Sequence, residues 1–296
     1  MSPQQKFSGH ENFPCRKFWL KKGYDFVANG CKFSDTDAIV NLGVGKNMVT
    51  AIQFWMRSFG LLDEDARLTR IAHFLFSDDG RDVYLEDIGT LWLLHYLLIS
   101  TGRATSYQLL FNEFRKQRVE FTREQFTNYL QRKAGEKDSN VSWRTLRSDV
   151  DVLIRTYLRP TARSRSPEDD FFSLLIDLDL FQGLSRPNSE GGTLYRIESK
   201  DRTFLPTEVV LFAMLQHYDG LSFSFSSLMA DPNNVGSVFV LSRDGLQRHV
   251  EEIARKFSDA TFSDDAGIKE LQFVQRPDPY EVLDHYYRNV KVLALS

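Results

Sequence analysis

The chain of 296 residues is 42% hydrophobic and 13% aromatic, which excludes a disordered protein and predicts two or three compact units with their own cores. Its net charge of −3 conceals an uneven distribution. Residues 1–32 carry six Lys or Arg against two acids, and residues 141–165 carry six Arg against two Asp. Because a DNA backbone responds to the patch that faces it, these two segments are candidates for contact with DNA.

The two cysteines, Cys15 and Cys31, are too few for a disulfide framework or for a zinc site built from cysteines alone. We expect both to be reduced thiols in a cytoplasmic protein. The longest apolar run, residues 91–99, is less than half of the roughly 20 residues that span a bilayer, so no membrane segment is expected.

The stretch at residues 7–23 places a histidine, a carboxylate, a thiol and four cations among large apolar side chains, and it is too short to bury itself. Cleavage of a phosphodiester needs a divalent metal with hard oxygen ligands, a base, and cations for the phosphate. His10 and Glu11 are the predicted metal ligands and, with Arg16, the predicted catalytic residues. The structural alternative is that Glu11 pairs with Arg16 and His10 holds a turn. Cys15 is expected to pack in a core.

Residues 34–62 are predicted to form a helix, a glycine turn and a second helix from residue 46 to 59. Val49, Ile52 and Met56 share the apolar face of the second helix, and cationic and polar side chains line its other face. This pattern is typical of a helix-turn-helix reader of DNA, with residues 68–80 leading into a wing. The alternative is a plain helical hairpin with a solvated face.

An apolar central helix is predicted next, capped by Asp87 and carrying His95 as a core histidine with a local partner. A metal site formed by Glu86, Asp87 and His95 is the less favoured alternative. Residues 103–133 are also expected to be helical.

A second cationic amphipathic helix is predicted from Ser142, and it suggests a second helix-turn-helix unit. Residues 159–170 are expected to be a linker or an exposed loop. The predicted DNA-binding residues of the whole chain are Lys17, Lys21, Lys22, Lys46, Asn47, Thr50, Gln53, Arg57, Arg144, Arg147 and Arg155.

In the last third of the chain, Pro206 is expected to begin one helix and Ser242 to cap another, and residues 261–262 would pair with 271–274 as a wing. The predicted fold is mainly α with short β ribbons and two or three winged-helix or helix-turn-helix-like units. Its segments are a basic arm at 1–32, a first winged-helix-like unit at 33–100, a second helical unit with its linker at 101–165, and a C-terminal winged-helix-like unit with a closing helix at 166–296.

Four motifs, in order along the chain, resemble the SspB-type proteins, a family long described as a domain of unknown function. They are residues 7–23, the Leu-Gly-Val-Gly-Lys-Asn-Met-Val sequence at 42–49, the Tyr-Leu-Glu-Asp-Ile-Gly-Thr-Leu-Trp-Leu-Leu-His sequence at 84–95, and Tyr-Arg-Asn-Val at 287–290.

The resemblance implies a magnesium-dependent DNA nickase of the bacterial Ssp phosphorothioation system, in which sulfur replaces a non-bridging phosphate oxygen. It also implies a cysteine desulfurase, an ATPase and a reductase-like sulfur-transfer protein as partners, and a role in defence against phage. It assigns no catalytic set, so His10, Glu11 and the cations after them rest on their chemistry. The alternative is a non-catalytic DNA-binding adaptor or transcriptional regulator, which would bind DNA in a salt-sensitive way without nicking it.

Overall fold

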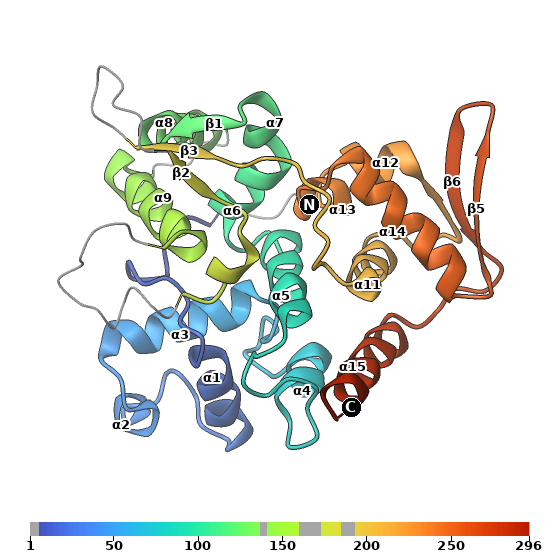
Figure 1. The fold of residues 1–296 in the computed structure, drawn as a ribbon. Helices are drawn as coiled ribbons and strands as arrows, with labels where there is room; N and C mark the ends of the chain where they lie inside the picture. Colours follow the sequence, from blue (N-terminus) through green and yellow to red (C-terminus); the bar gives the residue numbers. More distant parts are fainter. Residues whose placement is uncertain (1–5, 137–140, 160–172, 185–192, 296) are drawn as a thin grey trace. The chain divides into compact units, whose positions relative to one another are not determined.

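The structure, a computed structural model, describes residues 6–136, 141–159, 173–184 and 193–295. The chain forms two compact units, one comprising residues 1–197 and the other residues 198–296 (Figure 1). The first unit contains the opening arm and both predicted cationic helices. Within the described ranges, no helix is long and apolar enough to cross a membrane.

Helices dominate both units, so the prediction of a mainly α fold with short β ribbons is confirmed. The elements of the first unit are α1 (Trp19–Ala28), α2 (Ala38–Leu42), α3 (Lys46–Ser58), α4 (Arg70–Phe76), α5 (Ile88–Ser100), α6 (Thr105–Leu109), the π-helix η1 (Leu110–Phe114), α7 (Arg115–Gln117), β1 (Glu120–Thr122), α8 (Arg123–Gly135), α9 (Trp143–Tyr157), the 3₁₀-helix η2 (Ile176–Leu178), β2 (Gln182–Leu184) and β3 (Leu194–Arg196).

The predicted helix, glycine turn and helix at the start of the first unit are present. α2 ends at Gly43, whose φ of 60° is left-handed, and α3 begins after Gly45. The α3 residues Val49, Ile52 and Met56 are buried. The ribbon expected after residue 68 is absent: residues 63–100 are all described and contain no strand. Thr69 caps α4, accepting a hydrogen bond from the N–H of Ala72, so the segment expected to lead into a wing is a helix, and the wing itself does not follow it.

α5 is the buried helix expected from the sequence, and both predictions for its polar residues are confirmed. Asp87 caps it by accepting the N–H of Gly89 at 2.8 Å. His95 is fully buried, and its Nδ1 lies 2.8 Å from the hydroxyl of Tyr157 on α9. Each group has a hydrogen-bond partner inside the protein, as the structural interpretation predicted, and the described residues form no metal-holding cluster here.

β1, β3 and β2 form an antiparallel sheet with β3 in the middle, where Tyr195 lies opposite both Phe121 and Gly183. Because β3 pairs with β1, residues 173–197 belong to the first unit. The structure therefore places a unit boundary after Ile197 rather than at residue 166. The predicted linker at 159–170 lies outside the described residues after Arg159.

The second unit has a related arrangement of elements, and the helix cap and strand pairing predicted for it are confirmed. Its elements are α11 (Thr207–His217), β4 (Ser222–Ser224), α12 (Phe225–Ala230), α13 (Val235–Val238), α14 (Arg243–Lys256), β5 (Ala260–Asp265), β6 (Ile268–Phe273) and α15 (Pro279–Leu295). Ser242 caps α14 by accepting the N–H of Gly245 at 2.9 Å, and Phe262 pairs with Leu271. The sheet order β4-β6-β5 repeats the first–third–second order of β1-β3-β2.

Candidate nucleic-acid interface

The arm at residues 6–16 is held in a single conformation by a tight turn. The N–H of Phe13 donates to the carbonyl of His10 at 2.8 Å, and Glu11 and Asn12 between them have φ of 48° and 66°. Two successive positive φ values define a type I′ turn, a conformation that non-glycine residues adopt only when the surroundings enforce it. Gly9, with φ of 106°, leads into this turn against the ring of Phe54.

His10 points inward from this turn and is 4% exposed. Its Nδ1 accepts the N–H of Asn12 at 3.2 Å, so the ring proton is on Nε2, which lies 2.7 Å from Oδ1 of Asp149 on α9. The ring stacks on Trp55 of α3 at a centroid distance of 6.2 Å. The predicted alternative, that His10 holds a turn, therefore describes its contacts.

Asp149 fastens the arm to α9. It is 3% exposed, and its Oδ1 also accepts the N–H of Ser8 at 2.9 Å, while the hydroxyl of Ser106 donates to Oδ2 at 3.4 Å. These donors compensate the carboxylate for the loss of water, as a buried charge requires. The sequence expectation that the opening stretch docks on the rest of the chain is confirmed by these contacts.

Two further α9 residues hold the outer side of the turn. Arg155 donates from Nη2 to the carbonyl of Asn12 at 2.7 Å, and Ser148 donates to the side chain of Asn12. Glu11, next to Asn12, is exposed. His10 and Glu11, which were predicted to act together, lie in the same turn, with His10 facing the core and Glu11 facing solvent. Arg155, a predicted DNA-binding residue, holds this turn, whereas the structure gives Arg16, the third predicted catalytic residue, other contacts.

The predicted magnesium ligands do not form a complete donor set. Both ring nitrogens of His10 are already used, so neither offers a lone pair to a metal ion. Across the described ranges, no three His, Cys, Asp or Glu side chains gather closely enough to hold a metal. Glu11 remains as a single exposed carboxylate, and His10 does not fit the role of a ligand.

The other reactive groups of the arm are also placed by packing. Cys15 is fully buried, and burial raises the pKa of its thiol well above the usual value. A protonated, buried thiol cannot act as a nucleophile, which agrees with the expected packing role. Arg16 lies over the ring of Trp19 at 5.3 Å and forms a bridge with Ser173 through its backbone.

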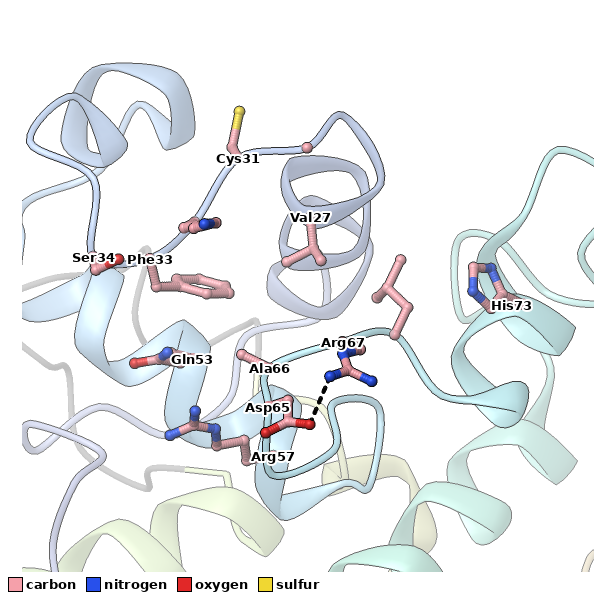
Figure 2. Close-up of a pocket in the computed structure, with 13 residues that line it drawn as sticks. Val27, Cys31, Phe33, Ser34, Gln53, Arg57, Asp65, Ala66, Arg67 and His73 are labelled. Carbon is pink, nitrogen blue, oxygen red and sulfur yellow. Dashed lines mark ion pairs between the residues drawn. The ribbon is translucent and has the colours of Figure 1, made fainter.

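α3 presents the predicted cationic stripe in two parts. Lys46, Asn47 and Thr50 are exposed on its first half. Gln53 and Arg57, one and two turns later, line a groove of about 810 Å³ bounded by the end of α1, residues 31–34 and residues 65–68 (Figure 2). Nε of Arg57 is buried without a hydrogen-bond acceptor.

A second groove, of about 500 Å³, is lined in part by the lysines of α1. Lys21 and Lys22 line it together with two exposed aromatic rings, Phe18 and Tyr84. Lys21 pairs with Asp25, and Lys22 donates to the carbonyl of Leu42 at 3.1 Å. Lys17 is half-buried just before this groove. Cys31 lines both hollows, so the two grooves adjoin at this residue.

α9 carries the remaining predicted contacts on its exposed side. Arg144 and Arg147 are exposed, and Arg147 lies 5.2 Å from the ring centre of Trp143. Arg155 continues the same stripe at helical spacing. Asp151, on the same helix, pairs with Arg123 of α8 at 2.5 Å. Because Arg123 offsets its negative charge, Asp151 neutralises little of the positive charge of the α9 arginines.

Sequence reasoning missed Asp149 as a functional partner and treated it only as a dilution of positive charge. Asp149 lies at helical spacing with the buried Leu146, Val150 and Leu153, so it is on the apolar face of its helix. A carboxylate on an apolar face signals a buried partner, although the sequence cannot name that partner. Phe18, Tyr84 and Cys31 were also missed, because their shared location depends on how separate segments pack.

Comparison with known proteins confirms the resemblance to SspB-type proteins expected from the sequence. A family model described as "Protein of unknown function (DUF4007)" matches residues 7–287. A solved SspB structure is similar with a TM-score of 0.83, and a magnesium ion-bound SspB structure with a TM-score of 0.82. Each is 29% identical and covers 97% of this chain and 89% of its own. No curated protein gives a significant sequence match.

Proposed function

Since this chain belongs to the DUF4007 family, and its structure is similar to that of SspB, we propose that it binds DNA and nicks one strand within a bacterial phosphorothioation system. It would act in the cytoplasm beside a cysteine desulfurase, an ATPase and a reductase-like sulfur-transfer protein, and the modification would support defence against phage. The partners and the defence role rest on the family resemblance. DNA binding and nicking have support from the residues themselves.

The observation that carries DNA binding is the position of the α9 arginines in the first unit. A strand, then helices, then a two-stranded ribbon follow one another in both units, with α8 and α9 described between strand and ribbon in the first unit and α12, α13 and α14 in the second. Both sheets have the strand order first–third–second. We infer that both are winged-helix-like, and the last described α-helix before the ribbon in each, α9 or α14, would then be the reader. In the first unit that helix is α9, whose exposed Arg144 and Arg147 would contact phosphates.

Strand cleavage would take place at the turn that is fastened to α9. Glu11 is an exposed carboxylate, and it would accept a proton from the attacking water as a general base. His10 would not touch the substrate. Its buried hydrogen bond to Asp149 would hold the turn, and with it Glu11, in position. The similarity to a magnesium ion-bound SspB supports a requirement for Mg²⁺, but of the two predicted ligands at the turn only Glu11 could contribute an oxygen to it.

A nicking assay on supercoiled plasmid tests this proposal. Glu11→Gln removes the base while keeping the size of the side chain, and we expect a rate at least about 100-fold lower than that of the parent. Glu124→Gln, an exposed glutamate in the first turn of α8, is the matched control and should nick at the parent rate. If Glu11→Gln nicks as fast as the parent, Glu11 is not the base.

The salt dependence of duplex binding tests the interface separately. Removal of one phosphate contact, in Arg144→Ala, should reduce the slope of log K against log salt concentration by about one. Arg132→Ala, an exposed arginine of α8 outside the predicted set, should leave the slope unchanged. If the parent binds DNA in a salt-sensitive way but makes no nicks with any divalent metal, the protein is instead a non-catalytic DNA-binding adaptor. The burial of His10, with both ring nitrogens hydrogen-bonded, favours this alternative.

A further inference from the structure

We propose that the two grooves that meet at Cys31 bind an unpaired DNA strand. This inference rests on the proposed function and deepens it, since it names the form of DNA that one surface of the first unit recognises. The surface, here called the Cys31 track, consists of Phe18, Lys21, Lys22, Tyr84, Cys31, Lys32, Gln53 and Arg57.

Charge is the first argument for a polyanion in the track. The two grooves are lined by five Lys or Arg side chains and by two carboxylates, Asp25 and Asp65. Each carboxylate is already paired, Asp65 with Arg67 at 2.8 Å and Asp25 with Lys21 (Figure 2 shows the first pair). The lining therefore has an excess of three positive charges, which attracts a phosphate backbone.

The cations that supply this excess are available to a ligand. Lys32 is exposed and Arg57 is half-buried, and the described residues provide neither side chain with an ion pair. The buried Nε of Arg57 lacks an acceptor, an uncommon state for a guanidinium N–H. In Figure 2, Gln53 and Arg57 extend from α3, and the ring of Phe33 lies beside Gln53. A phosphate in this groove would meet the exposed ammonium of Lys32 and the half-buried guanidinium of Arg57.

The aromatic side chains argue for an unpaired strand rather than a duplex. Phe18 is 54% exposed and Tyr84 is 59% exposed, and both line the groove that contains Lys21 and Lys22. Exposed rings beside cations are the features by which proteins bind single strands, because each unpaired base can stack on a ring. In a duplex the base faces are stacked on one another. Nicking supplies such a strand, since a nicked end can separate from its complement.

The first test measures binding of a labelled oligothymidine of about 15 nucleotides by fluorescence anisotropy. Phe18→Ala and Tyr84→Ala should each weaken binding about tenfold, the loss expected for one stacked base. Phe18→Tyr and Tyr84→Phe keep a ring and should bind within about twofold of the parent. Phe204→Ala removes a ring that is 81% exposed in the second unit and is the control for a general loss of aromatic surface.

A second test uses the track's own thiol. Cys31 is half-buried, whereas Cys15 is fully buried, so iodoacetamide should modify Cys31 alone in the folded protein. Saturating oligothymidine should slow this modification severalfold, as measured by mass spectrometry. Duplex of the same length and concentration should protect Cys31 less.

The outcomes separate this inference from the proposed function. Unchanged oligothymidine binding in Phe18→Ala and Tyr84→Ala, or equal alkylation of Cys31 with and without the oligonucleotide, overturns the track even when duplex binding and nicking are intact. Displacement of the oligonucleotide by polyglutamate, with the same dependence on both rings, would also overturn it in favour of an acidic protein. Loss of duplex binding and nicking by the parent would instead refute the proposed function.

Discussion

The turn at residues 10–13 and the Cys31 track are both rich in polar and aromatic side chains, but they use them in opposite ways. At the turn, His10 and Asp149 are buried and all their polar atoms have partners. In the track, the buried Nε of Arg57 has no acceptor, and two aromatic rings are exposed. The first arrangement builds the protein, and the second leaves bonding capacity for a ligand.

This difference shows that a cluster of reactive residue types does not by itself mark the place of reaction. His10 and Glu11 are adjacent in sequence, but the type I′ turn sends one side chain to the core and the other to solvent. Substitutions at the turn should therefore change stability, whereas substitutions in the track should change binding. The following measurements examine the stability side of this contrast.

The largest expected effect is that of Asp149→Ala. This change leaves the buried Nε2–H of His10 without an acceptor and removes the acceptor of the Ser8 N–H, and it should lower the free energy of unfolding of the first unit by about 3 kcal/mol. Urea unfolding followed by tryptophan fluorescence reports this unit alone, because all four tryptophans precede residue 198.

Asp151→Ala is the matched control on the same helix. Asp151 and its partner Arg123 are both more than a third exposed, so the loss of their pair should cost less than about 1 kcal/mol. Equal destabilisation by Asp149→Ala and Asp151→Ala would show that the His10–Asp149 contact does not fasten the arm.

The second unit also contains a buried histidine, His249, but its partner is the hydroxyl of Thr207 and not a carboxylate as for His10. Thr207 donates to Glu252 at 2.8 Å, so its oxygen accepts from Nδ1 of His249 at 2.9 Å. Burial lowers the pKa of His249 to about 4, and the charge of Glu252 opposes this shift while Arg248 and Lys256 add to it. The folded unit therefore disfavours protonation.

His249 makes the stability of the second unit depend on pH. The unfolded chain takes up a proton on this ring near pH 6.5, so stability is complete above that pH and falls by up to about 3 kcal/mol as the pH decreases toward 4. Hydrogen exchange of α11 and α14 amides, measured between about pH 7 and pH 4, reports this loss. His249→Gln should show a shallower decline, and an identical decline would contradict the assignment.

The smallest expected effect is that of Gly9→Ala. A Cβ at Gly9 would lie 2.7 Å from Cδ2 of Phe54, and the φ of 106° is unfavourable for alanine. We expect a loss of about 1 to 2 kcal/mol in the unfolding of the first unit. Gly135→Ala, in α8 with nothing near the new Cβ, should be neutral or slightly stabilising, and a similar loss there would remove the argument for steric fit at Gly9.

The sequence predicted the features that depend on local chemistry. α3, α9 and α14 begin where the glycine turn, Ser142 and Ser242 indicated, because caps and apolar periodicity act within a few residues. Asp87 and His95 were correctly interpreted for the same reason. The strands β1, β2 and β3 have three residues each, too few to show an alternating pattern.

The features that could not be predicted depend on contacts between distant segments. Asp149 is 139 residues from His10, and no local pattern connects the two. The pairing of β3 with β1 moved the unit boundary, and it likewise joins segments more than 70 residues apart. The Cys31 track requires α1, α3 and Tyr84 to be assembled before its rings and cations share a surface.

The separation of His10 and Asp149 along the chain also has a consequence for folding during synthesis. The arm leaves the ribosome before its partners on α9, because Asp149 is made 139 residues after His10, a delay on the order of ten seconds at usual rates of translation. During that interval the ring of His10 is in water and the turn has no support from Asp149. The arm therefore cannot dock on α9 until most of the first unit has been synthesised.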